Sequence, residues 1–256
     1  MRFREGLLLA AAAVAAVVCI RLGVWQLDRL EQRRAHNTAV LARFNAPPVE
    51  LDSLSAPAAN SFRRVRVRGR YDHPRELLLA NRPRRGSPGV HILTPLRYAG
   101  TDTAVLIVRG WVYAPDAAHT PTDRWREDSA TGDVGYVRHY AAKTGRPKRE
   151  PAGNTVRELD HTIISARLPY PLAPYLVVLI SESDQTGVTA VTTAEASRSE
   201  HPVRLESPTL GEGNHLSYAV QWFSFAAIAI IGATVLFLRG RRDAIAYDAD
   251  FQPSAR

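Results

Sequence analysis

An uncharged run of 23 residues, 216–238, restricts the fold of this chain more than any other feature. As a helix it is about 34 Å long, enough to cross the hydrocarbon core of a bilayer, which is about 30 Å thick. A second apolar block, residues 6–27, contains one charge, Arg21, whose long side chain can extend to the interface. Two membrane helices, one near each end of the sequence, are therefore predicted.

The first block also has an interpretation as a cleaved signal peptide, because a basic start precedes its apolar run. The apolar pattern continues beyond Arg21 through LGVWQL, which a signal peptide does not require. A lipoprotein signal at Cys19 is disfavoured, since Val18 stands where a small residue is expected. An uncleaved helix is the preferred interpretation, and the signal peptide stays open.

Arginine residues flank both apolar blocks on the side away from the middle of the sequence: Arg2, Arg4, Arg239, Arg241 and Arg242. Because positive charge favours the cytoplasmic side, both termini are predicted in the cytoplasm and the central domain outside. The predicted segments are a membrane helix over 1–27, an extracytoplasmic β-rich domain over 28–214, a membrane helix over 215–239 and a cytoplasmic basic tail over 240–256.

The middle of the sequence is typical of β-structure. Val65 and Val67 alternate with arginines in FRRVRVRGRYD, and the β-branched run AVLIVRGWVY is typical of a central strand. Further strands are expected in DVGYVRHY, near DHTIIS and in YLVVLISES. The predicted fold is a membrane protein whose two terminal helices flank a mainly β domain, a small sheet or barrel of about six or seven strands. A helical extension is expected from residue 28 to about 44.

The composition restricts the partners and the chemistry. The net charge of +8 comes mostly from arginine. In an exported domain tethered to a bilayer, such charge fits anionic lipid or an acidic partner better than nucleic acid. A single cysteine forms no intramolecular disulfide, and with one methionine it argues against a soft copper site. No nucleophile elbow, phosphate-binding loop, dinucleotide fingerprint or zinc-protease motif occurs, so the sequence nominates no enzyme.

Two features of the middle region have both a structural and a binding interpretation. The arginines of the first strand, at positions 64, 66, 68 and 70, could bind propionates, phosphates or an acidic partner. The solvated face of an amphipathic strand is the preferred interpretation. Trp111 could stack on a flat ligand, but an aromatic side chain in a buried strand is more often part of the core.

The two predicted membrane entrances carry an unusual set of polar and aromatic residues. LGVWQLDRL closes the first apolar block with Trp25 and Gln26, and NHLSYAVQWF opens the second with His215, Tyr218 and Trp222. Aromatic residues are common at membrane interfaces. An interfacial belt does not account for His215 and Gln26, because polar groups near the apolar region are costly and often functional. The residues alone favour a functional site and an aromatic belt equally.

These segments together resemble the surfeit locus protein 1 family of cytochrome oxidase assembly factors. The matching pieces are LGVWQLDRL, RRVRVRGRYD with ELLLANR, PGVHILTPL, VLIVRGWV and NHLSYAVQWFSFA, in the family's order. The resemblance is weak over residues 114–212. It implies a non-enzymatic chaperone that assists binding and insertion of haem a into the catalytic subunit of cytochrome c oxidase, with haem a synthase as a further partner.

The resemblance also implies a site for haem a, bound transiently. The family's haem-binding histidine maps onto His215, which is expected to ligate the iron. Tyr218, Trp222, Trp25 and Gln26 are expected to complete the cofactor-binding site. The expected location is a bacterial plasma membrane. The alternatives are a scaffold that stabilises an oxidase assembly intermediate without binding haem, and an unrelated membrane-anchored envelope protein.

Overall fold

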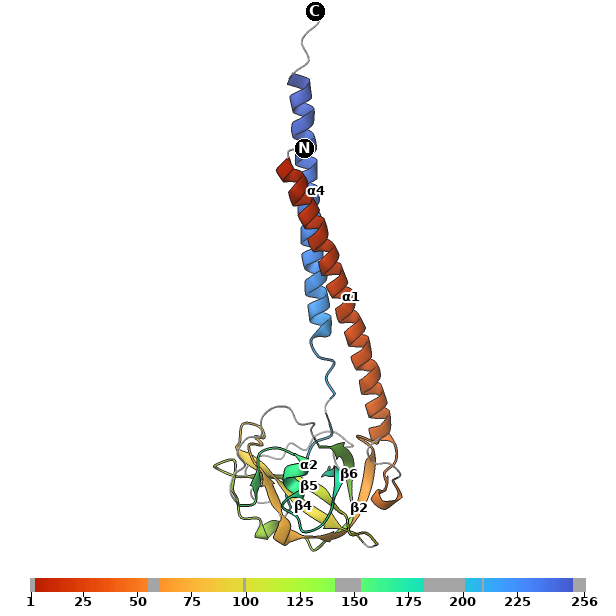
Figure 1. Ribbon diagram of the computed structural model, residues 1–256, viewed down its shortest axis with the longest axis vertical. Helices are drawn as coiled ribbons and strands as arrows, with labels where there is room; N and C mark the ends of the chain where they lie inside the picture. Colours follow the sequence, from red (N-terminus) through yellow and green to blue (C-terminus); the bar gives the residue numbers. More distant parts are fainter. Residues whose placement is uncertain are drawn as a thin grey trace, which may run out of the picture. The chain divides into compact units, whose positions relative to one another are not determined.

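A computed structural model describes residues 3–54, 60–98, 100–140, 153–181, 201–208 and 210–250 of the protein (Figure 1). The chain divides into two compact units. A helical unit combines Met1–Thr38 with Leu210–Arg256, and a β unit comprises Ala39–Thr209. Residues 182–183, the end of the strand predicted in YLVVLISES, lie outside the described residues.

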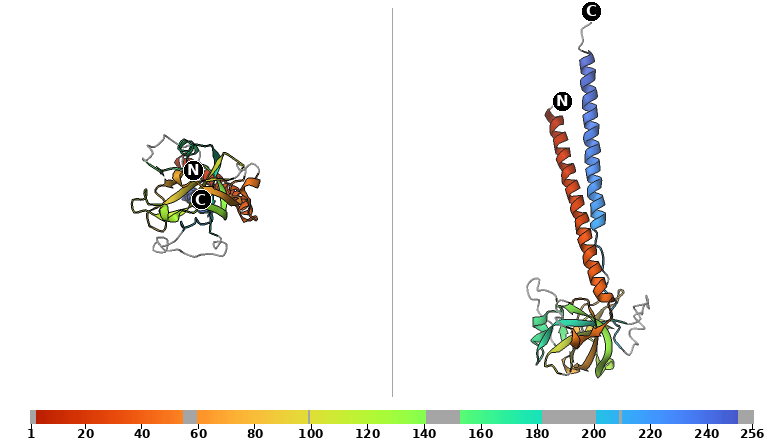
Figure 2. Two further views of the ribbon diagram at one scale, coloured as in Figure 1. Left: turned by 90° about the horizontal axis from the view of Figure 1, so that it is seen from below. Right: turned by 90° about the vertical axis from the view of Figure 1, so that its right-hand side faces the viewer.

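The helical unit contains α4 (His215–Asp250) and α1 (Phe3–Asn45) up to Thr38, and the remaining residues of α1 belong to the β unit. The two helices run antiparallel, so that the N-terminal end of α1 lies beside the C-terminal half of α4 (Figure 2). Both are long and apolar enough to cross a membrane by length and composition. Helix α1 continues without interruption past residue 27, so the predicted helical extension to about residue 44 is confirmed.

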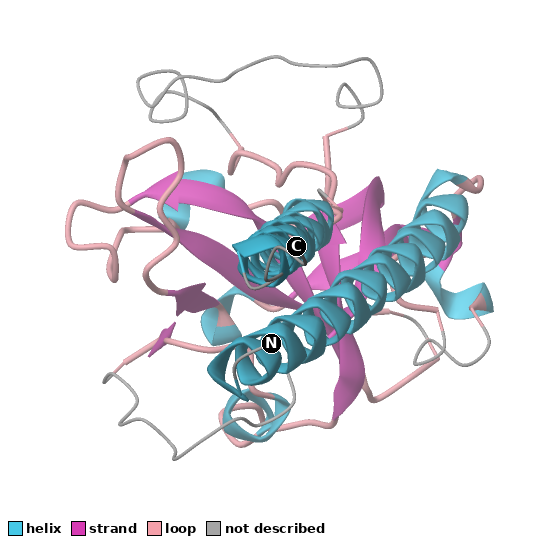
Figure 3. Ribbon diagram, turned by 90° about the horizontal axis from the view of Figure 1, so that it is seen from above, coloured by secondary structure: helices cyan, strands magenta, loops and turns pink. Residues whose placement is uncertain are grey.

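The β unit is built on a closed barrel of five strands (Figure 3). The barrel strands are β2 (Arg64–Tyr71), β4 (Gly89–Arg97), β5 (Ala104–Tyr113), β6 (Ser129–His139) and β8 (Leu172–Leu179). They pair in the order β2-β6-β8-β5-β4, and β4 pairs with β2 to close the ring. All neighbours are antiparallel except β5 and β8. Closure leaves no free edge in the ring.

The other described helices and strands of the β unit are short. They are β1 (Val49–Glu50), β3 (Leu77–Leu79), β7 (Thr155–Val156), η1 (Leu51–Ser53), η3 (His73–Arg75), η4 (Asp123–Trp125) and α2 (His161–Ser165). The described sheet thus has eight strands rather than six or seven. The strand predicted near DHTIIS is the two-residue strand β7, which ends at Val156, whereas DHTIIS itself forms α2. Asp160 caps that helix by accepting hydrogen bonds from the backbone N–H groups of Thr162 and Ile163.

Strand β5 is the centre of the core. Its residues Ala104 to Val112 are buried on both faces of the strand. Leu106 and Val108 pack into one apolar cluster, and Val105 and Ile107 into another. The prediction of a central strand here is confirmed. Trp111 is 2% exposed and donates a hydrogen bond from Nε1 to the carbonyl of Arg82 at 2.6 Å, so its assignment to the core is also confirmed.

A buried arginine on β5 organises the polar part of the core. Arg109 is fully buried and pairs with Glu76 and Glu127, each at 3.2 Å. It also donates to the carbonyl of Trp125, and Thr94 donates to Glu76 at 2.7 Å. Burial alone raises the pKa of the Glu127 carboxyl, but the nearby arginines outweigh this effect and lower the pKa below its usual range. The cluster connects β4, β5 and the loop before β6.

The arginines of β2 do not act as one binding surface. Arg66, Arg68 and Arg70 are exposed, as predicted for a solvated strand face. Arg64 is buried, stacks on the Phe44 ring and donates to the carbonyls of Asn45 and Ala46 at 3.4–3.5 Å. Its position at the end of α1 explains this, because the last carbonyls of a helix lack helical partners.

Candidate functional site

The candidate site lies in the helical unit, where α1 and α4 pack through small residues. Buried positions recur every seven residues, at Ala16 and Gly23 on α1 and at Ala219 and Ala226 on α4. Such spacing places the residues along one side of each helix. A Cβ atom at Gly23 would lie 2.7 Å from the ring of Phe223, closer than atoms in contact can approach. Glycine at position 23 therefore lets the two helices approach closely.

The centre of the site is a hydrogen bond between the helices. His215 is the first residue of α4, and its Nδ1 lies 2.9 Å from Oε1 of Gln26 on α1. Both side chains are half-buried. Because Oε1 only accepts, Nδ1 carries the proton, and in the neutral imidazole Nε2 is then the nitrogen with the lone pair. This is the tautomer that a metal ligand needs, and a second hydrogen-bond partner commonly fixes it in metal sites.

The backbone next to Nε2 carries no side chain. Gly213 has a φ of +73°, in the left-handed region that favours glycine. A Cβ atom at this position would lie 3.5 Å from Nε2 and 3.4 Å from Cδ2 of His215. A side chain at this position would begin in contact with the edge of the ring that carries Nε2. The turn into α4 therefore keeps one side of the imidazole accessible.

A polar clamp holds the segment before α4 against α1. Arg34 donates from Nε and Nη2 to the two carboxylate oxygens of Glu212, each at 2.9 Å. Arg33 donates to the carbonyl of Gly211 at 3.2 Å, and Asn37 to the same carbonyl at 3.3 Å. The hydrogen bonds that Arg34 donates to Glu212 lower the pKa of the Glu212 carboxyl and raise the pKa of the Arg34 guanidinium. An exposed ion pair of this kind contributes little stability, so the clamp serves to position the chain three residues before His215.

The other predicted site residues stand apart from this pair. Trp25 and Tyr218 are 52% and 48% exposed, and Trp222 is half-buried with an edge-to-face contact to Phe225. No hydrogen bond joins these three side chains to His215 within the described part of the chain. The structure thus brings together His215 and Gln26, while the aromatic residues lie along the surfaces of the two helices.

Sequence reasoning missed Arg34, Asn37, Glu212 and Gly213. The signal was present, since a basic pair in LEQRRAHN and an acidic residue in GEGN lie just beyond the two predicted membrane entrances. An acidic residue just before one helix and a basic pair at the corresponding depth of an antiparallel helix are a reason to expect an ion pair. The glycines on both sides of Glu212 were a further sign of a constrained turn.

These features define a class of protein in which the sequence of a closed β-barrel lies between those of two apolar helices. A histidine of one helix forms a hydrogen bond with a glutamine of the other. The particular family follows from comparison with known proteins. The chain belongs to the SURF1 family, whose model matches residues 13–227. This confirms the resemblance that the sequence motifs indicate.

Three relatives illustrate the likeness. A SURF1-like protein of Monosiga brevicollis is 30% identical, over 92% of this chain and 89% of its own length. An uncharacterized SURF1-like protein of Mycobacterium bovis is 29% identical, over 90% of this chain and 82% of its own length. The cytochrome oxidase assembly protein SHY1 of Saccharomyces cerevisiae is 26% identical, over 45% of this chain and 31% of its own length.

Proposed function

We propose that this protein is a membrane-anchored assembly factor for a haem-copper cytochrome oxidase and that it holds haem a through His215. Two findings support the oxidase role: membership of the SURF1 family, and similarity to a yeast protein named as a cytochrome oxidase assembly protein. The observation that carries the haem proposal is the hydrogen bond between His215 Nδ1 and Oε1 of Gln26, which makes Nε2 the nitrogen that a neutral imidazole would offer to iron.

The residues around His215 fit a haem cargo in three respects. A neutral imidazole that is protonated on Nδ1 is the form in which histidine ligates iron through Nε2. Gly213 leaves room beside Nε2. Trp222 follows His215 by two helical turns, so its indole offers an apolar surface on the same side of α4. The protein supplies a ligand and a surface for transfer of the haem, and the proposed role involves no catalysis.

The surfaces of α1 and α4 support the membrane anchor. Val14, Ile228 and Ile231 are 63–67% exposed, and many other large apolar side chains of the two helices are exposed with them. Burying apolar surface stabilises by about 25 cal/mol per Å², so two such helices in water would be strongly disfavoured. Lipid contact removes this cost. We propose that α1 and α4 span a bacterial plasma membrane with both termini in the cytoplasm, which puts His215 near its outer face.

A deletion strain tests the assembly role. We expect the strain to lose oxidase activity and the haem a signal of its membranes, and a plasmid copy of the gene to restore both. We expect His215→Ala to restore neither, whereas His36→Ala, which alters an exposed histidine of α1, should complement fully. Full complementation by His215→Ala would favour a scaffold that does not bind haem. Normal oxidase in the deletion strain would refute the assembly role itself.

A further inference from the structure

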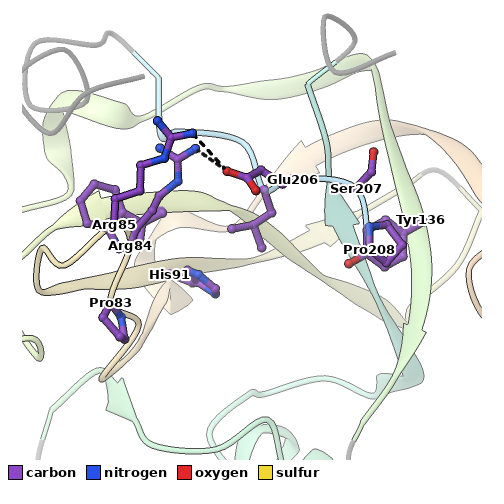
Figure 4. A pocket seen from close by; sticks show the side chains of 10 residues that line it. Pro83, Arg84, Arg85, His91, Tyr136, Glu206, Ser207 and Pro208 are labelled. Atoms are coloured by element: carbon purple, nitrogen blue, oxygen red, sulfur yellow. Dashed lines mark hydrogen bonds and ion pairs between the residues drawn. The ribbon is translucent and has the colours of Figure 1, made fainter. Parts of the chain in front are cut away.

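The β unit contains a second candidate site, a pocket of about 520 Å³ that is lined by residues of several strands and loops (Figure 4). Its volume lies within the range of pockets that bind small ligands, about 300–1,000 Å³. Arg84, Arg85 and Glu206 stand at one side, and His91 points in from β4. Trp111 and Tyr136 contribute aromatic surface. Nothing in the proposed handling of haem uses these residues.

A tight turn presents the two arginines. The backbones of Arg84 and Ser87 exchange two hydrogen bonds of 2.9 Å, which close a two-residue turn. Its central residues, Arg85 and Gly86, have φ values of 50° and 81°, both in the left-handed region. Turns of this kind favour Asn, Asp or Gly at the first central position. An arginine there carries a conformational cost, and such costs often occur at ligand-binding positions.

A carboxylate of the protein itself bridges the arginine pair. Oε1 of Glu206 lies 3.3 Å from Nη2 of Arg84 and 3.7 Å from Nη2 of Arg85. The Glu206 side chain is 59% exposed, whereas that of Arg84 is only 16% exposed. Two guanidinium groups therefore converge on one exposed carboxylate oxygen, which an incoming anion could replace without disturbing the core.

The pocket keeps an excess of positive charge despite Glu206. Burial, with the added effect of the positive charges of Arg82 and Arg138, lowers the pKa of His91 to about 3. His91 is thus neutral at pH 7 and can donate one N–H to a ligand. The positive charges of Arg82 and Arg138, which add to the effect of burial on His91, would also attract an anion.

We propose that this pocket binds the phosphate group of a small phosphorylated ligand, held by Arg84 and Arg85 after Glu206 moves aside. A carboxylate ligand would replace the Glu206 carboxylate with an equivalent group. Glu206 would win this competition because it is part of the chain and therefore has a high effective concentration at the site. A phosphate carries more charge and three acceptor oxygens, so it can accept hydrogen bonds from both guanidinium groups at once. The ligand is either a soluble phosphate ester or a lipid headgroup, which share this chemistry.

Calorimetric titration of the full-length protein in detergent micelles tests the proposal, with sodium phosphate, glycerol 3-phosphate and sodium acetate at equal ionic strength. Phosphate and glycerol 3-phosphate are expected to bind, and acetate at least tenfold more weakly. Arg84→Gln with Arg85→Gln should weaken phosphate binding by about tenfold or more, as the loss of hydrogen bonds to charged groups requires. Glu206→Gln should tighten it several-fold, because the competing carboxylate is gone.

Arg68→Gln is the matched control, since Arg68 is an exposed arginine of β2 that pairs with a single carboxylate, Glu50, at 3.5 Å. It should leave the affinity for phosphate unchanged. Nanodiscs of phosphatidylcholine with and without phosphatidic acid distinguish the sources. If phosphatidic acid prevents glycerol 3-phosphate from binding to wild type and to Arg68→Gln, the ligand is a headgroup; if glycerol 3-phosphate binds equally in both kinds of nanodisc, the ligand is soluble. Absence of phosphate binding to both wild type and Glu206→Gln, or equal binding of acetate, would overturn the proposal.

Discussion

Replacement of Gln26 by leucine tests how His215 is positioned. The substitution preserves the volume of the side chain and removes only the acceptor that lies 2.9 Å from Nδ1 of His215. A single hydrogen bond of this kind contributes about 1 kcal/mol to stability. Loss of the hydrogen-bond partner of a metal-ligating histidine typically lowers metal affinity by about 10- to 100-fold. We therefore expect Gln26→Leu to fold, and to bind haem about 10- to 100-fold more weakly than wild type.

The assay is titration of purified full-length protein in micelles with haem, followed by the haem absorption band. Gln26→Glu keeps an acceptor at the same place and should bind at least as tightly as wild type. Gln221→Leu is the matched control, because Gln221 is an exposed glutamine of α4. If Gln26→Leu binds haem as tightly as Gln221→Leu while His215→Ala abolishes binding, the argument that Gln26 fixes the tautomer is wrong.

Three further predictions concern packing, buried charge and pH. Gly23→Val should weaken the packing of α1 on α4 by about 1–3 kcal/mol because of the clash with Phe223, and Phe223→Ala in the same chain should restore the thermal stability measured in micelles. Arg109→Met removes the arginine partner of the buried Glu76 carboxylate and an arginine partner of Glu127, and should lower the free energy of unfolding by about 3–5 kcal/mol in chemical denaturation; an unchanged value would contradict the importance of the cluster. The pKa of His91 is about 3 in the folded protein against 6.5 for the ordinary side chain, so the unfolded chain binds more protons between these values and stability should fall as the pH drops from about 6.5 toward about 3. The pH dependence of unfolding should be flatter in His91→Gln, and identical curves would contradict this assignment.

The alternation of apolar and charged residues and the length of the apolar runs made the main helices and strands predictable. The pattern of valine and arginine around residue 66 fixed the inward and outward faces of β2, and the continuous apolar run identified β5 as central. The continuation of α1 past residue 27 was also predictable, since no glycine or proline occurs between residue 27 and the Pro-Pro pair at positions 47 and 48.

Local composition could not predict features that depend on distant contacts. The closure of the ring requires β4 to pair with β2 through Arg70 and Tyr71, and no local signal specifies such a pairing. The segment DHTIIS contains β-branched residues typical of a strand, but the cap at Asp160 favours a short helix. The helix cap at Asp160 outweighed the strand preference of the β-branched residues.

The histidine–glutamine pair was predictable only in part. The sequence placed Gln26 and His215 at corresponding ends of two apolar blocks, which made a meeting of the two helices plausible. That Nδ1 and Oε1 lie within hydrogen-bonding distance depends on the close approach at Gly23 and on the clamp from Arg34 to Glu212. Neither feature has a signature in the sequence of one helix alone.

The central claim is that His215 holds haem a, and the absorption spectrum of the purified protein tests it most directly. Full-length wild type and His215→Ala are purified in detergent from cells that make haem a, and their spectra are recorded at equal protein concentration. We predict a haem a band in wild type and its loss in His215→Ala. A wild-type protein that never carries haem, or a His215→Ala protein with an unchanged band, would contradict the assignment.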